Sequence, residues 1–261
     1  MPSVLIWTIS ISMCFLAFLV WGLFIFFTQR SKMETSAKVR FGIFSGVYLL
    51  GWLLLSLVLG SSGVFQTSHS TLFPAIALGI AVPILVGVLL LRHSHTLNSA
   101  IESVPLPWLV GVQLYRAFGF IFLALYAIGK LPAEFAIPAG VGDVLVGITA
   151  PVVGYLCFKG YRWSCLAVLG WNVVGIADLV IAVTFGFLSS PSLFQAFAID
   201  APNELITAFP LVLVPVFAVP LSILLHLATL KRLKVLVGVA SNISLNTDGP
   251  KRRCALLWPA G

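Results

Sequence analysis

The chain has 261 residues, of which 60% are hydrophobic and only 9% are charged, whereas a soluble domain is about 45–50% apolar and about 25% charged. A soluble fold of this size lacks the polar side chains to cover its surface, so the composition excludes a cytosolic enzyme and a disordered chain. The net charge of +7 does not indicate a nucleic-acid partner, because the basic residues lie between apolar runs and not on one face. The sequence therefore predicts an integral membrane protein whose surroundings are the lipid bilayer.

Seven apolar runs are each long enough for a transmembrane helix, which needs about 20 residues. Short polar connections separate them, and the charges inside the runs are single residues that we interpret as buried groups. The sequence predicts an all-α bundle of seven transmembrane helices in one domain, residues 1–234, followed by a polar cytoplasmic tail, residues 235–261. The predicted spans cover about 4–27, 41–60, 73–91, 107–129, 138–158, 163–188 and 208–230.

The basic residues predict the orientation, since cytoplasmic loops are enriched in Lys and Arg. One set of alternate loops, taken with the C-terminal tail, holds 13 basic residues, and the other set holds only Lys130. The remaining basic residue, Arg116, lies inside the fourth span. We therefore expect the N-terminus outside and the C-terminus in the cytoplasm, which agrees with an odd number of spans.

Two stretches near the seventh span have local signals of their own. Ser190-Pro191-Ser192 is typical of a helix start, and the apolar residues after it share a face, so we expect a short interfacial helix there. Residues 200–204 favour the start of the seventh helix. Pro210, Pro215 and Pro220 follow, and each leaves free a carbonyl four residues earlier, which predicts a bent helix.

Polar residues inside the spans form the most informative pattern. Arg116 lies near the centre of the fourth span, where a charge costs at least about 2.5–3.5 kcal/mol, and Gln113 lies on the same face three residues earlier. Asp143 in the fifth span and Asp178 in the sixth are the candidate partners, at similar depths toward the outside. We expect a polar interior that continues toward the cytoplasm with two further residues, Asn172 and His226.

The face of the fifth span that carries Asp143 also carries small residues, namely Gly147, Ala150 and Gly154. Small residues permit close helix packing, so Asp143 is expected to point into the bundle. One cation cannot balance two carboxylates, so one Asp, which we take to be Asp178, pairs with Arg116 and the other exchanges a proton or binds a cation. The alternative is a fixed ion-pair network that only orients the helices.

Residues 140–143, Gly-Val-Gly-Asp, resemble the GxGD motif of intramembrane aspartyl proteases such as presenilin and signal peptide peptidase. The resemblance implies a catalytic pair of aspartates, Asp143 with Asp178. In that family the partner Asp precedes the motif, whereas no Asp precedes Asp143 here, and the family's Pro-Ala-Leu triplet is missing. The resemblance therefore covers only four residues.

A broader resemblance links the chain to uncharacterised bacterial multi-pass membrane proteins without an assigned activity. It covers about the second half of the chain and rests on residues 113–116 (QLYR), 131–136 (LPAEFA), 138–143, 171–172 (WN) and 178–179 (DL). It implies a location in the bacterial inner membrane.

The leading hypothesis is a membrane protein that binds or translocates a small polar solute or a proton at a buried polar site. That site comprises Arg116, Asp143, Asp178, Gln113, Asn172 and His226. The alternatives are a membrane-embedded enzyme that uses the two aspartates, as the short GxGD-like match implies, and a structural or partner-binding subunit. We expect no cofactor and no metal site, since only one His lies within a span and the pair His93 and His95 supplies too few ligands.

Overall fold

The computed structural model describes residues 3–161 and 163–244, and every regular element within these ranges is helical. Its elements are α1 (Ser3–Arg30), α2 (Thr35–Ser61), α3 (Ala75–His93), α4 (His95–Ser103), α5 (Leu106–Gly111), η1 (Val112–Gly119), α6 (Phe120–Ala127), α7 (Ala133–Lys159), α8 (Ser164–Ser189), η2 (Leu205–Thr207), η3 (Val214–Ala218) and α9 (Val219–Ser244).

Seven helical segments of the described chain are long and apolar enough to cross a membrane, which confirms the predicted all-α, seven-helix bundle. They run over Leu5–Arg30, Thr35–Ser61, Ala75–His93, Leu106–Ala127, Ala133–Lys159, Ser164–Ser189 and Val214–Leu236. Several begin earlier than predicted, because polar residues such as Thr35 and Glu34 near the start of α2 belong to the first turn or its cap and do not raise the hydropathy.

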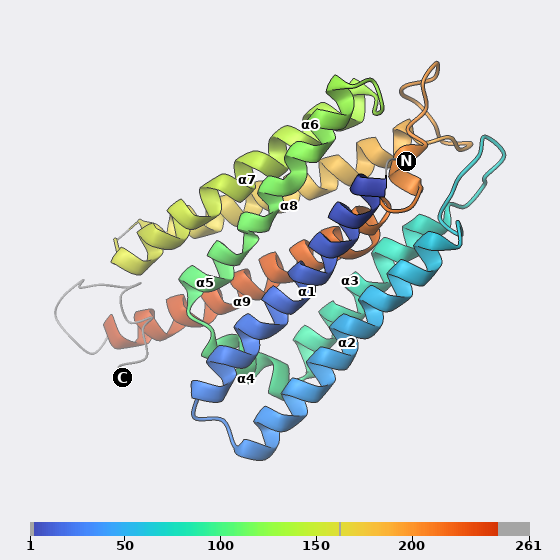
Figure 1. Ribbon diagram of the computed structural model, residues 1–261. Coiled ribbons are helices and arrows are strands. Elements are labelled where there is room, and N and C mark those ends of the chain that lie inside the picture. The colour runs from blue at the N-terminus through green and yellow to red at the C-terminus, as the bar shows by residue number, and fades with distance from the viewer. Residues whose placement is uncertain (1–2, 162, 245–261) are drawn as a thin grey trace.

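The seventh segment is the centre of the bundle. In its most apolar window 67% of the residues are buried, against 17–39% in the other six segments. Helix α9 packs against α8 on one side and α3 on the other, and it also contacts α5 (Figure 1). Polar residues on α9 are therefore the ones best shielded from lipid.

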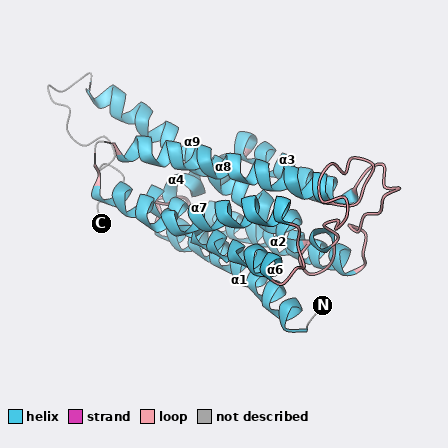
Figure 2. Cartoon of the chain, turned by 90° about the horizontal axis from the view of Figure 1, so that it is seen from above, coloured by secondary structure: helices cyan, strands magenta, loops and turns pink. Residues whose placement is uncertain are grey.

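The two ends of the bundle differ in their loops. Helix α1 begins at the end where the long connections 62–74 and 190–213 lie, and α9 finishes at the opposite end (Figure 2). Leu193 N donates a hydrogen bond to Thr71 O (3.3 Å), which joins the two long connections.

The fourth span is not one α-helix. It consists of α5, the 3-10 helix η1 and α6, so the eight residues around Arg116 are wound more tightly than their neighbours. The sequence predicted a single helix here, because a 3-10 segment and an α-helix have similar apolar patterns over so few residues.

The seventh span begins later than predicted. Residues 208–212 form a bend and turns, Leu213 caps the π-helix η3, and α9 begins only at Val219. The expected effect of Pro220 is nevertheless visible, because the carbonyl four residues before it, Val216 O, accepts a hydrogen bond from Trp52 Nε1 at 3.1 Å. A side chain of α2 thus replaces the backbone donor that proline lacks.

The expected interfacial helix after Ser190 is wrong, since residues 190–201 form bends and turns. Ser190 ends α8 and does not start a new helix: its Oγ donates to Gly186 O (2.7 Å). The backbone N–H groups of Ala196 and Phe197 both donate to Leu188 O, which fixes the segment as a cap over α8. These local bonds use donors and acceptors that a helix would need.

Candidate functional site

Arg116 lies at the centre of a buried polar cluster built from four helical segments. Its Nε donates to Asp143 Oδ1 (2.8 Å), and its Nη2 forms ion pairs with both Asp143 and Asp178. Its Nη1 donates to Gly175 O at 3.2 Å. The residue is only 3% exposed, so all of these bonds replace water that the guanidinium has lost.

Both aspartates bind the same guanidinium, which differs from the expected pairing with Asp178 alone. Asp143 comes from α7 and Asp178 from α8, and their side chains are 13% and 11% exposed. Arginine can join them because its planar fork presents five N–H donors in fixed directions. The cluster is therefore a three-residue ion network and not an isolated pair.

His226 and Asn172 extend the cluster away from the carboxylates. Arg116 Nη1 lies 3.2 Å from His226 Nε2, and a guanidinium only donates, so Nε2 accepts this bond. His226 Nδ1 lies 2.9 Å from Asn172 Oδ1 and is therefore the protonated nitrogen. Asn172 Nδ2 in turn donates to Val168 O at 2.7 Å. These contacts assign His226 as a neutral imidazole that orients Arg116.

Gln113, the last predicted member, lies one turn from Arg116 on η1 and is fully buried. Its Nε2 donates to Ser222 O on α9 at 3.2 Å, and its Oε1 has no partner among the described residues. Tyr115, which the sequence analysis did not select, donates its hydroxyl hydrogen to Ser222 Oγ, since that oxygen donates to Ala218 O (2.9 Å). The sequence signal that could have identified Tyr115 is its position directly before Arg116.

Glycines make room for the two carboxylates and the imidazole ring of the cluster. A Cβ on Gly142 would overlap the carboxyl group of Asp178, one on Gly119 would overlap Asp143, and one on Gly175 would overlap the His226 ring. The cluster therefore occupies places where neighbouring helices have no side chain.

The small-residue face of α7 packs as predicted. A Cβ on Gly147 would overlap the backbone of Ala117, and one on Gly154 would lie 2.9 Å from Pro107 O. This close approach of α7 to η1 and α5 brings Asp143 within reach of Arg116.

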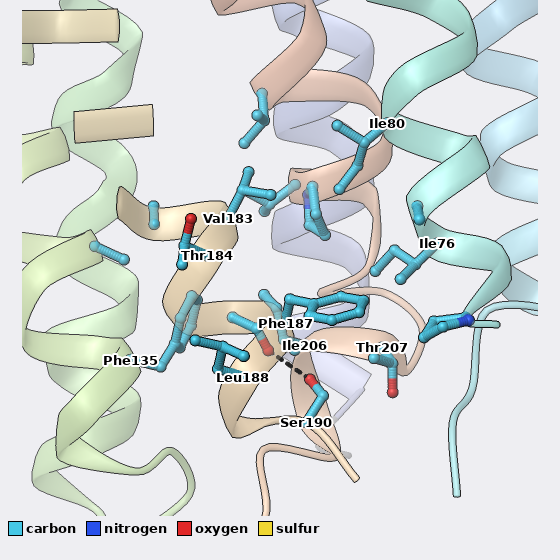
Figure 3. Close-up of a pocket in the computed structure, with 18 of the residues that line it drawn as sticks. Ile76, Ile80, Phe135, Val183, Thr184, Phe187, Leu188, Ser190, Ile206 and Thr207 are labelled. Atoms are coloured by element: carbon cyan, nitrogen blue, oxygen red, sulfur yellow. Dashed lines mark hydrogen bonds between the residues drawn. The ribbon is translucent and has the colours of Figure 1, made fainter. Parts of the chain in front are cut away.

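A cavity of about 360 Å³ adjoins the cluster at the end of the bundle that carries the long connections. It lies between α3, α7, α8 and the start of the seventh span, and Figure 3 shows its aliphatic and aromatic walls with Ile76, Phe135 and Phe187. A few hydroxyl groups also line it, among them those of Thr184 and Thr207. Asp143 is the one charged residue among the described residues that line this cavity.

The charges of the cluster do not cancel. With both carboxylates ionised and His226 neutral, one guanidinium faces two negative charges, which leaves one net negative charge in an apolar interior. A proton-sharing pair of catalytic aspartates needs the two carboxyl groups in direct contact. Here Arg116 bridges them instead, so this geometry does not favour the protease resemblance. The described residues hold no group of three or more His, Cys, Asp or Glu side chains suited to a metal ion.

A family model matches residues 73–234, which include the whole polar cluster and all elements from α3 to most of α9. The chain belongs to the DUF8737 family, a domain of unknown function. Helices α1 and α2 precede the DUF8737 match, so the family domain comprises the last five spans. No curated protein matches the chain, and neither does any solved structure.

Proposed function

We propose that this multi-pass membrane protein takes up one positive charge at Asp143, a proton or a small cationic solute that enters through the adjoining cavity. The supporting observation is that Asp143 alone among the described lining residues is charged, while its guanidinium partner is already shared with Asp178. By the resemblance stated above, we place the protein in the bacterial inner membrane.

The charge count supplies the driving force. An uncompensated charge inside a bilayer costs several kcal/mol, and a bound cation or proton would remove that cost. Asp143 is the better acceptor of the two aspartates because it faces the cavity, whereas Asp178 lies in the recess beside Gly142 and does not line it.

Proton uptake can be measured by infrared titration of the purified protein in lipid vesicles. We expect the wild type to keep a protonated carboxyl band at about pH 6, where exposed Asp and Glu with pKa values of about 4 are ionised, and we expect Asp143→Asn to lose this band. Asp200→Asn is the matched control, because Asp200 is exposed on the connection after α8. A wild type whose carboxyl bands all disappear by about pH 6, as those of exposed Asp and Glu do, would leave only a static ion network that orients the helices.

The proposed orientation has its own test. A reporter that is active only in the cytoplasm should be active when fused after Lys234 and inactive when inserted near Gln66, because the basic residues accumulate on the side of Lys234. The reverse pattern would refute an external N-terminus.

A further inference from the structure

A second, larger cavity of about 770 Å³ lies on the other side of α9, outside the polar cluster. Helices α1, α2, α3 and α9 form its walls and α4 closes one end. The side toward the bilayer is flanked by Phe44 and Val47 of α2 and by Val86 and Leu90 of α3, all of which are exposed. The cavity therefore opens sideways between α2 and α3, where a lipid can enter without leaving the membrane.

Arg40, the one charged side chain among the described residues that line this cavity, lies at one end, and the polar atoms of Ser45, Tyr48 and Trp52 further along α2 are bonded to backbone carbonyls. Arg40 near the start of α2 lies at the same end as Ser94 and Thr96, which belong to α4 and its cap. The deep end is apolar, with Trp52 of α2 and Leu221 of α9. Arg40 and Trp52 are twelve residues apart on one helix, or about 18 Å at about 1.5 Å per residue. This length is close to the hydrocarbon thickness of one leaflet, about 15 Å.

Arg40 is exposed and forms no ion pair with any described residue. It belongs to a basic stretch that runs from the end of α1 to the first turns of α2 and also holds Arg30, Lys32 and Lys38, on the side predicted to be cytoplasmic. Acidic lipids attract basic residues at the cytoplasmic surface. Arg40 at the opening therefore complements the negative headgroup of an acidic phospholipid. The apolar cavity behind it is long enough for an acyl chain.

We infer that the cavity binds one acidic phospholipid of the bilayer, with the phosphate at Arg40, Ser94 and Thr96 and an acyl chain along α2 toward Trp52. Arg40 supplies the preference for a negative headgroup, and the apolar walls bind the chain. This site is independent of the proposed uptake of charge at Asp143, which lies in the other cavity.

Native mass spectrometry of the detergent-solubilised full chain tests the site, with dioleoyl phosphatidylglycerol and dioleoyl phosphatidylcholine added in parallel. The wild type should retain phosphatidylglycerol about fivefold better, since one basic residue contributes about 1 kcal/mol toward an anionic lipid. Arg40→Gln should abolish this preference. Arg30→Gln, which removes the same charge from a side chain held over Phe26, should keep it.

A second pair of variants tests the chain-binding part. Val86→Trp fills the opening and should lower the retention of both lipids, while Val82→Trp, one turn away on the exposed surface of α3, should not. Melting temperatures near that of the wild type establish that the variants fold. Equal retention of the two lipids by the wild type, or an unchanged preference in Arg40→Gln, would overturn the inference, as would retention of free fatty acid in place of phospholipid.

Discussion

Arg116→Ala is expected to lower the free energy of unfolding by about 3–5 kcal/mol, the usual cost of removing one partner from a buried ion pair. The substitution leaves Asp143 and Asp178 facing each other without a cation, and it removes the donor to Gly175 O. Thermal or denaturant unfolding in detergent measures the loss.

Lys130→Ala is the control for this measurement, because Lys130 is exposed after α6 and its removal should be nearly neutral. Arg116→Lys should recover only part of the loss, since an ammonium group has three donors and cannot reproduce the planar fork that joins both aspartates. Equal unfolding of Arg116→Ala and Lys130→Ala would show that Arg116 is not a buried partner.

The two aspartates are expected to respond differently to the same substitution. Asp178→Asn should cost about 1–3 kcal/mol, because the recess beside Gly142 holds the new amide group against the guanidinium with no room to reorient, while Asp143 still pairs with Arg116. Asp143→Asn should cost about 1 kcal/mol, since asparagine resembles the protonated acid in shape and the cavity gives it room to reorient.

Unfolding of Asp143→Asn, Asp178→Asn and the exposed control Asp200→Asn under one set of conditions compares these effects. Large and equal losses for Asp143→Asn and Asp178→Asn would mean that Arg116 needs both carboxylates ionised. That result would support a fixed ion network and contradict the uptake of a charge at Asp143.

Helix number could be predicted from the sequence, because a bilayer requires about 20 apolar residues for each crossing and apolar runs of that length are unmistakable. Helix ends could not, because hydrogen bonding determines them and hydropathy does not report it. Ser190 illustrates this. Ser190-Pro191-Ser192 is typical of a helix start, but the Ser190 hydroxyl group donates to Gly186 O of the preceding helix α8. Residues 235–244 of the predicted tail continue α9, and residues 245–261 lie outside the described part of the chain, so the rest of the tail remains a prediction.

The sequence predicted which residues form the polar cluster, but it did not predict how they pair. A charged residue inside a span must find a partner, which identified Asp143 and Asp178, and the glycine face of α7 showed which way Asp143 points. The bridging of both carboxylates by one guanidinium depends on the relative rotation of α7, α8 and η1, which a linear sequence does not encode in its spacing. The neutral state of His226 likewise follows from neighbours on two other elements.

The 3-10 winding of η1 ties the length of the fourth span to the ion network. Eight residues at about 2.0 Å each reach about 4 Å further than the same residues at the about 1.5 Å rise of an α-helix. Rewinding from Val112 to Arg116 would also turn the arginine by about 80° around the helix axis, since a residue turns about 120° in one form and about 100° in the other. Arg116 would then lose contact with its two carboxylates, so its ion pairs stabilise the 3-10 conformation of η1. Whatever loosens either carboxylate also releases a restraint on how far this segment extends across the bilayer.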